Sequence, residues 1–402
     1  MTHHPTPSPA APGVSRRGFL RAGTVAALLG GAGVTPRTGP LLPTAAAAEP
    51  TGEWRNRQPG MAYRRLGRTN LMISEVVSGG DPITLANYKH LELALDMGLN
   101  YLDMAPAYNR GDTEAAYGKL LGGSAARRQK VFLTTKVSDF NRVRERMCKA
   151  IFDGLPGEKQ TAIQKWAAEL RAQRGVDKPG YYLTYFPGQP RSLDLPYLRI
   201  AMMADYAHRV EGSPEFRRTI VESLEGSLKR VGTDHFDLLM CPHGANAPEE
   251  LRCPEIAETF QQLKRQGKVR FLGVTSHNDP AGVLRTAAEV GHYDAVMCAY
   301  NVINGGYLED ALRLAAAKDV GVIAMKAAHA VATHHKSLQP VPEWRVLKIN
   351  RIIPGDMKPP MKAYLWALQN PNIAAVISNL WDETYVRENL SLAGKKVELQ
   401  PA

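Results

Sequence analysis

Four ionisable side chains stand where short apolar runs of the sequence end. Asp103 closes one run, Lys136 closes the next, and His243 lies 3 residues beyond a run that ends at Met240. Tyr108 follows Asp103 by 5 residues. A single residue of this kind is more often a helix cap or a solvent-facing charge. Four that converge on one mouth of a fold would form a site for proton chemistry.

These side chains together suit proton transfer to an oxygen atom. Tyrosine, with an ordinary pKa of about 10, is a poor acid at neutral pH. The ammonium of Lys136 is expected to lower the pKa of Tyr108, with Asp103 keeping the lysine charged, while His243 donates a hydrogen bond to the bound oxygen. Such a set protonates a carbonyl oxygen as a hydride reaches its carbon, or runs the reverse. Because no side chain carries a hydride, this chemistry requires a nicotinamide.

The elements that would position these residues alternate between short β-type runs and longer helical patterns. Eight strands, each followed by a helix, predict an α/β protein with a closed (β/α)8 TIM barrel, and residues 63–67 are expected to join a hairpin over its floor. The predicted strands are 72–77, 101–103, 131–136, 236–240, 269–274, 295–299, 320–325 and 374–377. The predicted helices are 86–97, 112–121, 214–231, 252–266, 279–290, 307–318, 359–369 and 382–392.

One segment interrupts this alternation. Residues 138–213 form a predicted large insertion after the third strand, whereas a normal connection of this kind has about 2–6 residues. The segment has helical patterns over 157–174 and 198–210 and is rich in tyrosine. Because it follows a strand, it should emerge at the catalytic end of the barrel. Two alternatives are weighted equally. The insertion forms a lid or a substrate wall, or it is a decorative insertion or an oligomer contact.

The N-terminal residues have the order of features found in an export signal. Arg16 and Arg17 precede an uncharged stretch rich in Ala and Gly over 22–34, and 44–48 read Thr-Ala-Ala-Ala-Ala. This order is typical of a twin-arginine signal peptide, and the stretch is too short to span a bilayer. That route carries folded proteins, often with a loaded cofactor. The expected divisions are a signal peptide over 1–48, a linker over 49–60 and the barrel over 61–402.

Charge and cysteine usage exclude some classes of function. The net charge of +11 falls to +7 when the four arginines of the signal leave, and the remaining basic residues are dispersed. A nucleic-acid partner is therefore not expected. The four cysteines form no C-x-x-C pair and no Cys/His cluster, so no metal site is predicted. We expect no stable membrane anchor after cleavage.

A set of motifs gives the chain a family resemblance. It resembles the aldo-keto reductases from about Met61 to Gly394, outside the insertion. The motifs are Gly98-Leu-Asn-Tyr-Leu-Asp103-Met-Ala-Pro-Ala-Tyr108, Leu133-Thr-Thr-Lys136, the run from Ser223 to His243, Gly267-Lys-Val-Arg-Phe-Leu-Gly-Val-Thr-Ser276-His277, Gly321-Val-Ile-Ala-Met325-Lys326 and Glu388-Asn389-Leu390.

This resemblance implies the same four catalytic residues and a nicotinamide coenzyme. The implied cofactor-binding residues are Thr275, Ser276 and His277 near the carboxamide, Met325 and Lys326 at the ring and pyrophosphate, Ser378 and Asn379 after the last strand, and Glu388 and Asn389 at adenine. The family usually prefers NADP. Here Tyr385 stands where an arginine often is, and Met297 replaces a common glutamine, so NADP and NAD both stay open.

The sequence thus predicts an exported, periplasmic or extracellular NAD(P)-dependent oxidoreductase that reduces a carbonyl or oxidises the alcohol. A sugar-like substrate and a tightly bound cofactor suit a protein outside the cytoplasm, where free coenzyme is scarce. The expected partners are the small-molecule substrate and the twin-arginine translocation machinery, with an oligomer through the insertion. The alternative is a non-catalytic carbohydrate- or protein-binding module on a retained reductase fold.

Overall fold

The computed structural model describes residues 52–185, 188–333 and 340–401 of the 402-residue chain. The predicted signal peptide over 1–48 lies outside the described residues. Among these residues no helix is long and apolar enough to cross a membrane.

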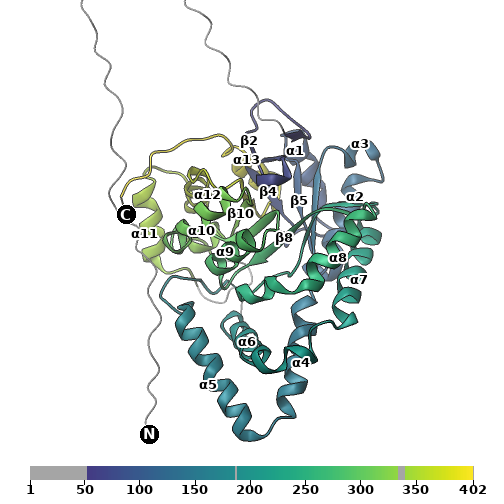
Figure 1. The fold of residues 1–402 in the computed structure, drawn as a ribbon. Coiled ribbons are helices and arrows are strands. Elements are labelled where there is room, and N and C mark those ends of the chain that lie inside the picture. The colour runs from purple at the N-terminus through teal and green to yellow at the C-terminus, as the bar shows by residue number, and fades with distance from the viewer. Residues whose placement is uncertain (1–51, 186–187, 334–339, 402) are drawn as a thin grey trace, which may run out of the picture. The chain divides into compact units, whose positions relative to one another are not determined.

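Eight parallel strands close into a barrel in the order in which they occur along the chain, with helices around the outside (Figure 1). This confirms the predicted (β/α)8 barrel. The barrel strands are β4 (Val76–Gly79), β5 (Tyr101–Asp103), β6 (Phe132–Lys136), β7 (Phe236–Met240), β8 (Val269–Ser276), β9 (Ala295–Ala299), β10 (Gly321–Met325) and β11 (Ala375–Ser378). The α-helices of the described residues are α1 (Leu91–Asp96), α2 (Asp112–Leu121), α3 (Ala125–Arg128), α4 (Phe140–Asp153), α5 (Gly157–Arg174), α6 (Asp194–Tyr206), α7 (Pro214–Val231), α8 (Pro254–Arg265), α9 (Pro280–Val290), α10 (Gly305–Ala317), α11 (Glu343–Ile352), α12 (Pro359–Gln369) and α13 (Glu383–Leu390).

A small sheet covers the floor of the barrel. β3 (Leu71–Ser74) pairs antiparallel with β2 (Tyr63–Arg65) and parallel with β1 (Glu53–Trp54). The hairpin predicted at the floor is therefore present as β2 and β3. The prediction of one barrel strand over 72–77 is wrong, because its first part belongs to this floor sheet.

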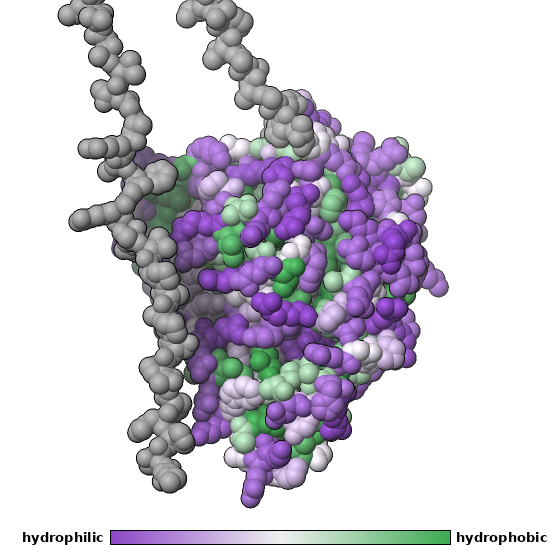
Figure 2. All heavy atoms as spheres, in the orientation of Figure 1, coloured by the Kyte–Doolittle hydropathy of each residue, from purple (hydrophilic) through white to green (hydrophobic). Residues whose placement is uncertain are grey.

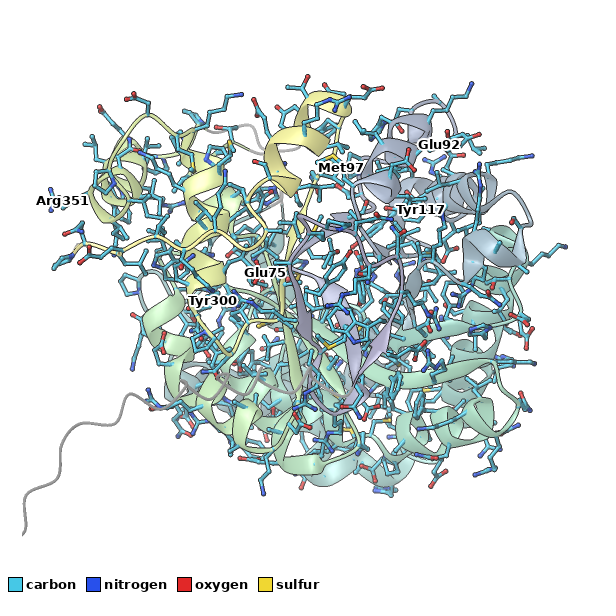
Figure 3. All side chains as sticks on the ribbon, turned by 90° about the horizontal axis from the view of Figure 1, so that it is seen from above. Glu75, Glu92, Met97, Tyr117, Tyr300 and Arg351 are labelled. Carbon is cyan, nitrogen blue, oxygen red and sulfur yellow. The ribbon has the colours of Figure 1, made fainter. Side chains whose placement is uncertain are left out.

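The physical reason for that error is burial on both sides. Leu71 and Ile73 pack into the floor of the barrel, and Val77 packs into its interior, so the sequence shows one nearly continuous apolar run. Ser74 and Glu75 interrupt it, and the carboxylate of Glu75 is bonded to Arg64 at 2.6 Å. Figure 3 views the chain from above Figure 1 and shows Glu75 near the centre.

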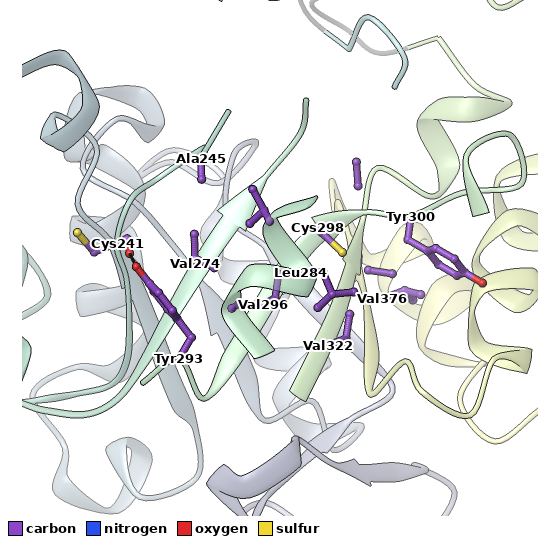
Figure 4. Close-up of a cluster of buried hydrophobic side chains, with 14 of the residues drawn as sticks. Cys241, Ala245, Val274, Leu284, Tyr293, Val296, Cys298, Tyr300, Val322 and Val376 are labelled. Atoms are coloured by element: carbon purple, nitrogen blue, oxygen red, sulfur yellow. Dashed lines mark hydrogen bonds between the residues drawn. The ribbon is translucent and has the colours of Figure 1, made fainter. Parts of the chain in front are cut away.

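Side chains on the barrel strands alternate between two apolar layers. Along β9, Ala295 and Met297 face the barrel interior, whereas Val296 and Cys298 face the helices. This follows from the two-residue period of a strand, because successive side chains point to opposite faces. Figure 4 shows the outer layer, in which Leu284 of α9 belongs to the same cluster. All four cysteines are buried free thiols.

A long connection carries α4, α5, α6 and α7 between β6 and β7. The predicted helix over 157–174 is confirmed as α5, and that over 198–210 occurs four residues earlier as α6. α7 begins at Pro214, where the Ser213 hydroxyl accepts the amide of Glu215 as an N-cap. Figure 2 shows hydrophilic side chains over most of the visible face, with apolar ones scattered among them. Trp166 of α5 and Leu195 of α6 are exposed large apolar side chains.

A buried carboxylate ties the amino ends of the barrel strands together. Asp237 on β7 is fully buried and contacts Arg55 at 3.2 Å, Arg128 at 3.0 Å and Arg270 at 2.6 Å. It also accepts the backbone amide of Leu133 at 2.9 Å. Burial alone would raise the pKa of Asp237, but the arginine charges lower it.

We expect Asp237→Asn to lower the free energy of unfolding by about 3 kcal/mol, because three guanidinium groups lose their shared anion. Urea unfolding at neutral pH measures this change. Asp234→Asn, on the exposed turn before β7, is the matched control and should shift stability by less than about 0.5 kcal/mol. Equal effects of the two substitutions would contradict a structural role for the buried carboxylate.

Candidate active site

One cavity of about 700 Å³ lies at the carboxyl ends of the barrel strands. Asp103 reaches it from the end of β5, Tyr108 from the turn that follows, His243 after β7 and Lys326 after β10. Lys136 lies behind Tyr108, with its ammonium 4.5 Å from the centre of the tyrosine ring. The four predicted catalytic side chains are therefore together in the structure.

Lys136 and Asp103 form a buried ion pair between neighbouring strands. Lys136 Nζ lies 2.5 Å from Asp103 Oδ1 and 2.8 Å from the carbonyl oxygen of Met104. Burial lowers the pKa of Lys136 and raises the pKa of Asp103, while the charge of each partner opposes the shift of the other. Because the pair is almost fully buried, loss of either partner would leave an uncompensated charge.

The turn after β5 aims Tyr108 at the cavity. Asn109 and Arg110 directly follow it with left-handed φ angles of 47° and 57°. Asn109 stabilises this turn by donating from Nδ2 to the carbonyl oxygen of Asp81 at 2.8 Å. Gly80 makes room beside it, since a Cβ there would lie 2.2 Å from the carbonyl oxygen of Asp103.

The electrostatics of Tyr108 differ from the sequence expectation. Burial raises the pKa of its phenol well above the ordinary value, and the carboxylates of Asp103 and Asp81 raise it further. This direction is opposite to the expectation that Lys136 would lower the pKa: burial and the two carboxylates outweigh the ammonium, which is paired with Asp103 at 2.5 Å. Tyr108 therefore keeps its proton, which is the form that can donate one.

His243 is a neutral imidazole at the edge of Tyr108. The two ring centres are 5.7 Å apart, and the planes are nearly perpendicular. Burial, then the charges of Lys136 and Lys326, lower the pKa of His243 to about 3. The hydroxyl of Ser138 lies 2.9 Å from Nδ1. If the neutral ring accepts a hydrogen bond from this hydroxyl at Nδ1, its own proton is on Nε2.

The nine residues that the resemblance assigned to a cofactor divide into two groups. Those that line the cavity are His277, Met325, Lys326, Asn379, Glu388 and Asn389. Thr275, Ser276 and Ser378 are buried and support the wall from behind.

The supporting residues fix the loops that carry the lining residues. Thr275 Oγ1 accepts the amide of Gly244 at 2.7 Å, and Ser276 Oγ donates to the carbonyl of Ala245 at 2.8 Å. These bonds join the end of β8 to the loop of His243. Asn389 Nδ2 donates to Ser378 Oγ at 2.9 Å, which leaves its amide oxygen for other contacts.

The structure adds cavity residues that sequence reasoning missed. Asp81 follows β4, and the rule that strand ends carry polar site residues would have found it if β4 had been placed correctly. Lys358 also lines the cavity and pairs with Glu388 at 2.6 Å. No sequence signal distinguished this lysine from solvent-facing ones.

The β6–β7 connection contributes Tyr185 to the cavity wall. Its hydroxyl accepts a hydrogen bond from Asn301 Nδ2 at 2.9 Å, and its ring centre lies 6.0 Å from that of His277. The ammonium of Lys326 lies 5.8 Å from the same ring. The tyrosine-rich composition of this segment pointed toward a wall, but it did not single out this residue.

Comparison with known proteins identifies the class that this barrel and site define. Residues 85–342 match the Aldo/keto reductase family. The chain belongs to this family.

Individual relatives match over part of their length. An uncharacterized oxidoreductase, YrpG, of Bacillus subtilis is 28% identical over 224 residues, which are 53% of this chain and 48% of that protein. The aldo-keto reductase AMT2 of Alternaria alternata is 25% identical over 267 residues, 62% of this chain and 59% of that protein. A 6-dehydroglucose reductase of Novosphingobium aromaticivorans is 30% identical over 124 residues, 26% of this chain and 40% of that protein. The chain thus matches about half the length of these relatives.

Solved structures show the same fold. The holo form of the aldo-keto reductase AKR11C1 from Bacillus halodurans superposes with a TM-score of 0.54 at 20% sequence identity, covering 84% of this chain and 92% of that one.

The depressed pKa of His243 predicts a pH dependence of stability. Between about pH 3 and about pH 6.5 the unfolded chain binds a proton at this residue that the folded chain does not. The free energy of unfolding therefore falls as the pH drops below about 6.5. We expect His243→Gln to flatten this slope by up to about 1.4 kcal/mol per pH unit, measured by urea unfolding across that range. If the free energy of unfolding varied with pH in parallel for wild type and variant, the imidazole of His243 would be solvated and its pKa would not be depressed.

Proposed function

We propose that this protein is an NAD(P)H-dependent oxidoreductase that reduces a carbonyl group or oxidises the corresponding alcohol. The observation that carries the proposal is the convergence of a protonated Tyr108, the buried Lys136–Asp103 pair and a neutral His243 on one cavity.

Each of these residues has a role in moving one proton. Tyr108 donates its phenolic proton to the carbonyl oxygen, and His243 donates a hydrogen bond from Nε2 to the same oxygen. Lys136, beside the tyrosine ring, stabilises the phenolate that remains, and Asp103 holds the lysine in place. The nicotinamide, when bound, supplies the hydride.

The lining residues suit a nicotinamide dinucleotide. Lys326 offers a cation for a diphosphate, and both Lys326 and His277 lie within about 6 Å of the Tyr185 ring centre, at 5.8 Å and 6.0 Å. At the other end, Glu388 and Lys358 form an ion pair, whereas Tyr385 offers no charge. Glu388 can accept a hydrogen bond from a ribose hydroxyl, and Lys358 can bind a phosphate, so the binding of both NADH and NADPH should be measured.

The cavity favours a sugar-like substrate. Its wall includes the carboxylate of Asp81 and the amides of Asn246 and Asn278, which suit hydroxyl groups. The partial similarity to a 6-dehydroglucose reductase points to the same chemistry. We assign residues 138–213 as an insertion that forms part of this wall, as the position of Tyr185 supports, and that also offers a surface for oligomer contact.

The proposal extends to the location of the protein. The twin-arginine pattern supports export to the periplasm or the exterior, and cleavage after Ala48 would release the soluble barrel from its translocation machinery. A tightly held cofactor that is reduced and reoxidised without release would suit this location.

Tyr108→Phe tests the catalytic proposal. It should lower carbonyl reduction by about 100-fold or more, because the proton donor is lost, as followed by the absorbance of NADPH or NADH. Tyr117→Phe is the matched control, since it removes a buried hydroxyl bonded to Ser78 at 2.9 Å, and it should keep turnover close to wild type. Retained turnover in Tyr108→Phe would refute the assignment. A wild-type protein that binds ligand without turnover would favour the binding module.

Native mass spectrometry of the exported protein tests location and cofactor retention together. We expect a chain that begins at Glu49 and carries the mass of one nicotinamide dinucleotide. A chain without nucleotide would end the idea of a retained cofactor. A chain that keeps Arg16 and Arg17 would end the assignment of a cleaved signal.

A further inference from the structure

A relay of amide groups runs from the β6–β7 connection to the cavity wall. It begins at the backbone N–H of Tyr185, which donates to Gln189 Oε1 at 2.6 Å. Gln189 Nε2 donates to Asn278 Oδ1 at 2.8 Å, and Asn278 Nδ2 donates to Asn246 Oδ1 at 2.6 Å. Each side chain thus receives from one neighbour and donates to the next.

The backbone at the start of the relay sets its direction. A backbone N–H can only donate, so Gln189 must present its oxygen to Tyr185 and its nitrogen to Asn278. Asn278 must then present its nitrogen to Asn246. The amide nitrogen of Asn246 is left at the end of the relay, on a side chain that lines the cavity. Within the described part of the chain, Asn246 Nδ2 donates to no protein group.

A second support holds the backbone of Asn246. Its N–H donates to Glu250 Oε2 at 3.2 Å. Glu250 is fully buried and is bonded to Arg199 of α6 at 2.5 Å and to Asn141 of α4 at 2.7 Å. The β6–β7 connection thus holds Glu250 and Asn278, which in turn hold the backbone and the side-chain oxygen of Asn246, so the ordering of its amide nitrogen does not depend on substrate.

We infer that Asn246 is a specificity-determining residue that donates a hydrogen bond to a substrate oxygen close to the reacting carbonyl. This inference rests on the proposed function. Asn246 follows His243 by 3 residues on the same loop, which keeps their backbones within about 10 Å of each other, and both residues line the cavity. The donor alone would suit a hydroxyl or a carboxylate. Asp81 follows β4, across the barrel mouth from the loop after β7 that carries Asn246, and its carboxylate accepts from a hydroxyl, so the substrate class is a hydroxy-carbonyl compound.

The experiment compares glyceraldehyde with propanal, which have the same carbon number and differ in hydroxyl groups. The readout is the ratio of kcat/KM for the two aldehydes. Asn246→Leu should lower this ratio by about three- to tenfold, because one hydrogen bond to a neutral hydroxyl is lost. Asn372→Leu, beyond α12 at the amino end of β11, is the control and should leave the ratio unchanged.

The outcomes separate the inference from the proposed function. If wild type reduces both aldehydes and Asn246→Leu keeps the wild-type ratio, the inference is overturned and the proposed function stands. If wild type reduces neither aldehyde, the inferred substrate class is overturned, whereas the proposed function is overturned by retained turnover in Tyr108→Phe. If the leucine variant is unfolded by circular dichroism, Asn246→Asp replaces it, since it keeps the acceptor for Asn278 and removes the donor. An unchanged ratio in that variant also overturns the inference.

Discussion

The buried contact between Lys136 and Asp103 is the constraint on which the site depends. It joins the carboxyl ends of β5 and β6, and Lys136 Nζ lies 2.5 Å from Asp103 Oδ1. Both side chains are almost fully buried, so solvent cannot take the place of either charged partner. Two ions are stable at this depth only when they remain paired, so the register of the two strands and the chemistry of the mouth are coupled. The turn that carries Tyr108 begins from the same strand end.

The two other members of the catalytic set, His243 and Tyr108, are uncharged beside this pair. His243 is neutral because burial and two nearby ammonium groups oppose its protonation. Tyr108 is protonated because burial and two carboxylates oppose its ionisation. A proton donor and a hydrogen-bond donor are therefore both in their useful forms before a substrate arrives, and the lysine counters the phenolate only after the proton has left.

Much of this arrangement was readable from the sequence. The alternation of strand and helix predicted the barrel, and polar residues at strand ends predicted Asp103, Lys136 and His243. The first strand was misplaced, because residues buried on both sides read as one apolar run, and Asp81 was missed as a consequence. The relay that ends at Asn246 had no signature, since single amides far apart in the sequence look like ordinary loop residues.

The sequence by itself determined which side chains occupy the ends of the strands, because local periodicity and turn residues set where each strand stops. Only the tertiary structure decided their ionisation states and the direction of the amide relay. Both depend on burial and on partners from distant segments, such as Lys326 near His243 and Gln189 beside Asn278. A pKa and a hydrogen-bond direction are properties of an environment, and a linear pattern does not contain that environment.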